Sequence, residues 1–147
     1  MPKLMDMDKK IGDLLKPALR LDKFFRDKLS LDSVKMLFPL SGRYRYDKDE
    51  YILTQGEESK DLYVVEAGSV AITKTLGTAG VELAVLKPGS IFGEIALIRD
   101  GVRVASAVAA EECRVFRLDY RDIQSLMTGH PELADHLKEL AKQRSGG

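Results

Sequence analysis

Residues 92–106 read FGEIALIRDGVRVAS, and no other stretch of the chain says as much about fold and chemistry. Two glycines, Gly89 just before the stretch and Gly93 within it, let the backbone turn tightly or approach a ligand closely. The residues after Gly93 have the composition of a single helical turn, whose free N–H groups can hold an anion. Arg103 follows at the start of a β-rich run, where its guanidinium can form two parallel hydrogen bonds to a phosphate.

Glu94 and Arg103 admit two interpretations on spacing alone. In the first, Glu94 accepts hydrogen bonds from a sugar hydroxyl while Arg103 holds a phosphate. In the second, the two side chains form an ion pair on a surface loop that contains a short helical turn. The residues by themselves do not decide between a nucleotide site and a plain loop.

The segments around this stretch are short, rich in β-branched residues and separated by glycines. This pattern is typical of an antiparallel barrel, roll or sandwich. The expected strands are 51–53, 62–65, 70–75, 81–86, 105–109 and 114–118.

Helical periodicity marks the N-terminal part, residues 8–38. Pro17 lies inside the pattern, so we expect a break or kink near Lys16. A second helical stretch follows, and Asp32 or Ser33 is a suitable N-cap for it.

The C-terminal part is also helical. Asp119 is expected to cap a short helix that breaks at 129–131, and Pro131 is expected to begin the last helix. The expected organisation is an N-terminal helical segment at 1–38, a β-roll at 39–118 and two helices at 119–147.

Composition excludes several classes of protein. The 147 residues include 23 basic and 23 acidic side chains, and this zero net charge argues against a surface built to grip DNA or an anionic membrane. One cysteine, Cys113, rules out an internal disulfide and a multi-cysteine zinc site and fits a reducing, cytoplasmic location. There is no apolar run long enough to span a membrane and no secretory signal. Two histidines are too few for a metal-dependent enzyme of the cupin type.

The quoted stretch resembles the phosphate-binding cassette of the cyclic nucleotide-binding domain family. In that cassette Phe-Gly-Glu precedes apolar residues, a short loop and an Arg followed by small residues. Residues 55–57, QGE, and 68–70, GSV, are similar to two further family motifs in the same order. The resemblance covers about residues 24–144. It implies an α+β fold, an antiparallel, jelly-roll-like β-roll of eight strands flanked by N-terminal helices and two C-terminal helices.

The resemblance also implies a 3′,5′-cyclic nucleotide ligand and assigns roles to matching positions. Arg103 and the backbone amides of Ile95 and Ala96 match the groups that bind the cyclic phosphate. Glu94 matches the acceptor of the ribose 2′-hydroxyl, and Gly93 matches the glycine that permits close approach.

The positions that match the wall around the purine are less distinctive, because apolar strand residues also build ordinary core. They are Val70, Ile72, Leu83, Ala84 and Leu86. Arg144 matches the region of a lid residue over the base, where a guanidinium can stack on a purine. A solvated Arg at a frayed helix end is the other interpretation of Arg144.

Val104 follows the matched arginine, where many family members carry Ser or Thr. Because Val offers no hydroxyl to a guanine amino group, we expect a modest preference for cAMP over cGMP. Leu97 resembles the cassette residue that packs on the first C-terminal helix, at Ile123, Leu126 or Met127. Its movement is expected to release the helices toward an effector.

The leading hypothesis is therefore a cAMP-sensing module in signal transduction, not an enzyme, which itself contacts no nucleic acid. One alternative is the sensor part of a DNA-binding regulator without its helix-turn-helix. Another is an interaction domain that has kept the roll and lost the ligand. The retained Glu94 and Arg103 argue against the last.

Overall fold

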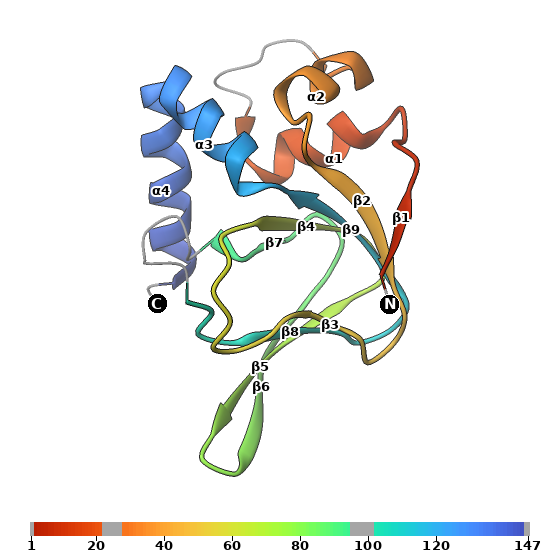
Figure 1. Ribbon diagram of the computed structural model, residues 1–147, viewed down its shortest axis with the longest axis vertical. Helices are drawn as coiled ribbons and strands as arrows, with labels where there is room; N and C mark the ends of the chain where they lie inside the picture. Colours follow the sequence, from red (N-terminus) through yellow and green to blue (C-terminus); the bar gives the residue numbers. More distant parts are fainter. Residues whose placement is uncertain (1, 22–27, 95–101, 146–147) are drawn as a thin grey trace.

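The computed structural model describes residues 2–21, 28–94 and 102–145, with the side chains of 144 and 145 not included. Helices gather at one end of the molecule, two sheets form the body, and a long hairpin projects from the opposite end (Figure 1). The helices are α1 (Ile11–Ala18), α2 (Leu31–Leu37), α3 (Tyr120–Gly129) and α4 (Pro131–Ser145). The strands are β1 (Lys3–Met5), β2 (Gly42–Tyr46), β3 (Tyr51–Leu53), β4 (Leu62–Ala67), β5 (Val70–Leu76), β6 (Ala79–Leu86), β7 (Ile91–Phe92), β8 (Ser106–Ala109) and β9 (Cys113–Leu118).

The strands form two antiparallel sheets. One sheet has the order β1-β2-β9-β4-β7 and the other has the order β3-β8-β5-β6. This α+β arrangement, a roll with helices before and after it, confirms the expected fold class. The strand β1 was not anticipated, because it lies in the segment that we expected to be helical.

The first sheet is covered on both faces around the middle of β4, where residues 62–65 are apolar and all buried. On the outer face, Leu62 and Phe116 pack with helical residues such as Leu15 and Ile123 in one core cluster. On the inner face, residues such as Val65 join a second cluster between the two sheets. The uninterrupted apolar run at 62–65 therefore reflects a strand between two layers.

The helix ends show which sequence signals were decisive. Asp119 caps α3 by accepting a hydrogen bond from the N–H of Arg121, and α4 begins at Pro131, so both expectations are confirmed. The N-cap of α2 is Ser30, whose extended backbone lets its hydroxyl accept from the N–H of Ser33. The expectation of Asp32 or Ser33 was therefore wrong, since both residues lie inside the helix.

The expected break near Lys16 was wrong, because α1 continues through Pro17 and ends at Ala18, whereas the alternative of a kink there stays a prediction. Pro17 has no N–H to donate to the carbonyl of Asp13 and its ring crowds that carbonyl, and the helix ends one residue after it. Just after the helix, the N–H of Leu19 donates to the carbonyl of Leu15, and the N–H of Arg20 donates to the carbonyl of Pro17.

The hairpin of β5 and β6 is the most exposed part of the sheets (Figure 1). Its strand β6 lies at the edge of the second sheet and exposes Val81, Leu83 and Val85. The base of the same hairpin, at Ile72 and Leu86, packs against the core between the sheets. The hairpin therefore runs from a base packed on the core to an outer part exposed to solvent.

Candidate functional site

Arg103 is the charged centre of a pocket inside the roll, and its backbone is fixed before its side chain is considered. The N–H of Arg103 donates to the carbonyl of Glu57 at 2.9 Å, and its own carbonyl accepts from the N–H of Gly56 at 2.8 Å. These two hydrogen bonds join the 55–57 turn to the backbone of Arg103, just before β8. This explains why two motifs that lie almost fifty residues apart in the sequence belong to one site.

The guanidinium of Arg103 is buried, with only 6% of the residue exposed. Its Nε donates to the hydroxyl oxygen of Ser59 at 2.8 Å. Its Nη1 donates to the carbonyl of Gly93 at 3.1 Å, and its Nη2 to the carbonyl of Asp61 at 2.8 Å. These acceptors hold the plane of the guanidinium in one orientation.

A guanidinium has five N–H donors, and three of those of Arg103 are used in these hydrogen bonds. One donor on Nη1 and one on Nη2 are left for a ligand. Among the described residues, no carboxylate forms a salt bridge with Arg103. Burial lowers the pKa of Arg103, but an arginine stays charged even so. The pocket therefore contains a fixed positive charge with donors to spare, which suits an anion.

Only glycine fits at position 93, beside Arg103. Its φ is +86°, and a Cβ would lie 2.8 Å from the carbonyl oxygen of Asp61 and 3.1 Å from Nη1 of Arg103. The backbone of Gly93 thus comes close to Arg103, while its close approach to a ligand stays a prediction. Glu94 follows and is 8% exposed at the edge of the pocket. Ile95, Ala96 and Leu97 lie outside the described residues.

The pocket has a volume of about 290 Å³, near the lower end of the range for small-ligand sites. Four of the five expected wall positions line it, and so does Val104. These four are Ile72, Leu83, Ala84 and Leu86. Val70 does not line the pocket, because it is fully buried in the core between the sheets.

Several lining residues were not anticipated. Leu53 and Phe92 form part of the wall, and Phe92 stacks on Tyr63 with ring centroids 5.0 Å apart. Ser59 and Asp61, which hold Arg103, were also missed. The sequence signal available was only their position after the QGE turn, since residues of that turn bind the backbone of Arg103.

The C-terminal helices pack in the helical core cluster, and none of their described residues lines the pocket. Ile123 and Leu126 are buried in the helical core cluster, and Met127 packs against it. In Figure 1, α4 runs along the side of the molecule from the helical end toward the level of the roll. Arg144 belongs to the last turn of α4, but its side chain is outside the described part.

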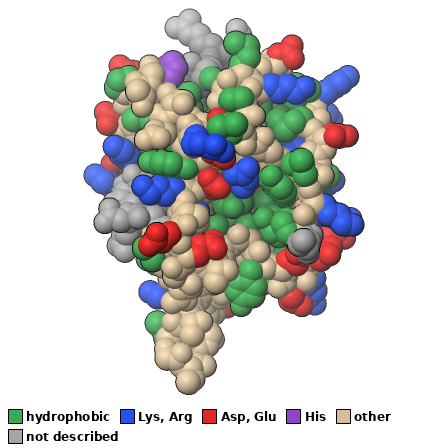
Figure 2. Space-filling model, in the orientation of Figure 1, with side chains coloured by type: hydrophobic (Ala, Val, Ile, Leu, Met, Phe, Trp, Pro, Cys, Tyr) green, Lys and Arg blue, Asp and Glu red, His purple; other side chains and the backbone are tan. Residues whose placement is uncertain are grey.

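The distribution of charged side chains on the surface agrees with the zero net charge of the chain. Figure 2 shows acidic and basic side chains interspersed over the visible face, with no continuous basic area. The described residues contain no helix that is both long and apolar enough to cross a membrane.

Comparison with known proteins places this geometry in a family. Residues 43–130 match the family model of the cyclic nucleotide-binding domain. The cyclic AMP receptor protein of Thermus thermophilus is 34% identical over 117 residues, which cover 79% of this chain and 54% of that protein. The chain therefore spans about half the length of this relative.

Solved structures give the same result. The regulatory domain of Toxoplasma gondii PKA, crystallised with cAMP, superposes with a TM-score of 0.73 and 27% identity, covering 92% of this chain and 50% of that one. A domain from Methylobacillus flagellatus superposes with a TM-score of 0.76, covering 98% of this chain and 82% of that one, at 20% identity. The second likeness speaks for the fold alone. The chain belongs to the cyclic nucleotide-binding domain family, whose ligands are cAMP or cGMP.

Proposed function

We propose that this chain senses cAMP, in preference to cGMP, and passes the occupancy of its pocket to an effector through its C-terminal helices. The observation that carries the proposal is the guanidinium of Arg103, which is buried, oriented by three acceptors and left with two donors. A cyclic phosphodiester is a compact anion whose two exocyclic oxygens match such a pair.

The apolar walls fit the rest of the nucleotide. Leu83 and Val102 line the pocket although about half of each residue is exposed, so a purine placed there removes apolar surface from water. Glu94 is the proposed acceptor for the ribose hydroxyl, and the amides of Ile95 and Ala96 are proposed as further phosphate donors. Arg144 remains the proposed lid.

Two named relatives support cAMP as the ligand. One is the cyclic AMP receptor protein of T. thermophilus, and the other is the PKA regulatory domain of T. gondii, crystallised with cAMP. Val104, in the pocket wall, supports only a modest preference over cGMP, since it withholds one hydrogen bond.

The effector is not defined by these relatives, because a human cyclic nucleotide-gated channel subunit is also 31% identical over 115 residues. We propose a non-catalytic role, in which binding and release leave the nucleotide unchanged. A cytoplasmic location suits such a sensor and suits Cys113, a buried thiol whose pKa burial raises to about 11.

Calorimetric titration with cAMP, cGMP and 5′-AMP tests the proposal. We expect cAMP to bind most tightly and Arg103→Ala to weaken cAMP binding at least about 100-fold, because two charge-assisted hydrogen bonds are lost. Arg45→Ala, which also removes one positive charge but lies outside the pocket, is the matched control and retains binding. Absence of binding for both cyclic nucleotides would overturn the proposal.

A further inference from the structure

Asp61 touches both the ligand-facing arginine and the first C-terminal helix. Its backbone carbonyl accepts from Nη2 of Arg103 at 2.8 Å. Its side-chain Oδ1 accepts from the backbone N–H of Tyr120, the first residue of α3, also at 2.8 Å. Its Oδ2 accepts from Nη1 of Arg117 at 3.0 Å. One residue thus joins the pocket to the helix without passing through the core.

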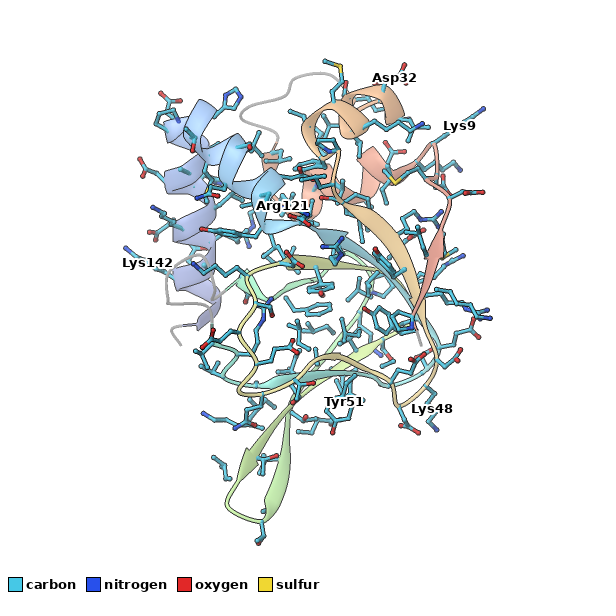
Figure 3. The ribbon with its side chains drawn as sticks, viewed as in Figure 1. Lys9, Asp32, Lys48, Tyr51, Arg121 and Lys142 are labelled. Atoms are coloured by element: carbon cyan, nitrogen blue, oxygen red, sulfur yellow. The ribbon has the colours of Figure 1, made fainter. Side chains whose placement is uncertain are left out.

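The start of α3 depends on acceptors that lie outside the helix, as helix N-termini do. Asp119 satisfies the N–H of Arg121 with its carboxylate and those of Asp122 and Ile123 with its carbonyl. For Tyr120, the hydrogen bond among the described residues is the one to Asp61. Arg121 marks this point in Figure 3, where the helical end meets the roll.

The surrounding polar contacts make the link stiff. Nη1 of Arg117 is shared between Asp61 and Asp119, at 3.0 Å and 3.2 Å. The N–H of Asp119 donates to the hydroxyl of Ser41 at 2.9 Å, and that hydroxyl donates to Asp122 at 2.7 Å. Charge-assisted hydrogen bonds of this length are directional, so a shift of Asp61 is carried to the helix start.

We propose that Asp61 is a positioning residue that couples occupancy of Arg103 to the first turn of α3. The inference rests on the proposed function, in which a phosphate takes the two remaining donors of Arg103. A phosphate held there fixes the guanidinium, and the shared Nη2 then fixes the peptide of Asp61. The carboxylate of the same residue holds the N–H of Tyr120 more firmly in consequence. This polar route is separate from the apolar route that we expect to begin at Leu97.

Amide hydrogen exchange at Tyr120, followed by NMR with and without cAMP, tests the coupling. In the wild type, cAMP is expected to slow this exchange at least threefold. Asp61→Ala removes the acceptor, so basal exchange rises about tenfold and no longer responds to cAMP. Calorimetry on the same variant gives its affinity for cAMP, and the exchange is measured at a cAMP concentration that saturates it. Asp61→Asn keeps an Oδ1 acceptor and is expected to restore the response.

Asp122→Asn is the matched control. Asp122 fastens α3 to Leu40 and Ser41 and does not contact Arg103, so its loss weakens the helix attachment and leaves the cAMP response at Tyr120 in place. A cAMP response in Asp61→Ala equal to that of the wild type would overturn the inference. So would a wild-type protein that binds cAMP while Tyr120 stays unchanged.

A ligand-free arm separates this inference from the proposed function. Arg103→Lys shortens the side chain and cannot reproduce the guanidinium contacts, so it is expected to change Tyr120 exchange at least threefold when Asp61 is present. In the Asp61→Ala background the same substitution is expected to have almost no effect. Additive effects of the Arg103 and Asp61 substitutions on Tyr120 exchange would refute the coupling even if no nucleotide binds. Absence of nucleotide binding in calorimetry would count against the proposed function and not against the coupling.

Discussion

Nη1 of Arg103 donates to the carbonyl oxygen of Gly93 at 3.1 Å, and a Cβ on Gly93 would lie equally close to that nitrogen. The guanidinium of Arg103 is therefore held by the same backbone that leaves no room for a side chain at position 93. This contact connects the stability of the loop before the pocket to the orientation of the guanidinium.

Gly93→Ala is expected to weaken both folding and cAMP binding. The positive φ alone costs about 1–2 kcal/mol, and the crowding against Asp61 and Arg103 adds to it. Thermal unfolding and calorimetry measure the two effects. Gly89→Ala is the control, because Gly89 has a φ of +92° with nothing within 4 Å of its Cβ position. Equal losses in the two variants would show that crowding plays no part.

Ser59→Ala is expected to weaken cAMP binding about three- to tenfold while the protein stays folded. The hydroxyl of Ser59 accepts from Nε of Arg103, so its loss frees the guanidinium to rotate. Titration calorimetry gives the affinity and circular dichroism the fold. Ser59→Thr retains a hydroxyl and should bind like the wild type; a loss as large as that of Ser59→Ala would contradict the role.

Val104→Thr is expected to raise the affinity for cGMP relative to cAMP about two- to tenfold. The two side chains have the same shape, and the new hydroxyl offers one hydrogen bond to the guanine amino group. Competition of both nucleotides against a fluorescent analogue measures the ratio. An unchanged ratio would remove Val104 from the account of selectivity and leave the binding proposal intact.

The pH dependence of stability is expected to include a contribution from Asp119. Hydrogen bonds from Arg121 first, and then from Arg117, hold the pKa of this carboxyl well below its ordinary value of 3.8. Because the folded pKa is depressed, the stabilisation is complete above about pH 4 and is lost as pH falls through the folded value.

Asp119→Asn keeps a good helix cap and removes this titration. We expect it to cost about 0.5–1.5 kcal/mol at pH 7 and progressively less below pH 4, measured by urea unfolding. Parallel stability curves for the two proteins across this range would show that the charge of Asp119 contributes nothing.

Arg43 and Glu66 form a bidentate pair in which the side chains are only 8% and 16% exposed. Removing one partner leaves the other charge largely buried, so Arg43→Met or Glu66→Leu alone is expected to cost about 3 kcal/mol. The double variant should recover most of this loss in urea unfolding. Neither residue lines the pocket, so cAMP affinity should remain. A double variant as unstable as the sum of the singles would contradict this account.

The strands of the roll could be predicted where a run of β-favouring residues ends at turn residues. Residues 51–53 are found with the expected bounds for this reason. The strand β1 could not be predicted, because three residues carry no usable alternation and the strand exists only by pairing with β2, some forty residues away. The N-cap of α2 was misplaced by two or three residues because Ser30, Asp32 and Ser33 are all competent caps, and backbone geometry decides among them.

The site was foreseen in part. The motif brought Gly93, Glu94 and Arg103 together, and the structure places all three at one pocket. The contacts of Arg103 with Ser59 and Asp61 span more than forty residues and depend on how the 55–57 turn is docked. Val70 shows the opposite difficulty. It shares the apolar character of the other wall positions, and only its depth in the core separates it from them.

The β5–β6 hairpin offers a practical use of the molecule. Leu83, Ala84 and Leu86 near its base belong to the pocket wall, while a side chain added at Gly77 or Gly80 near its tip would meet no atom within 4 Å. An inserted reporter at this tip would have open space around it and would be connected by two strands to the residues that line the pocket. A circularly permuted fluorescent protein placed there would turn the domain into an optical gauge of nucleotide concentration.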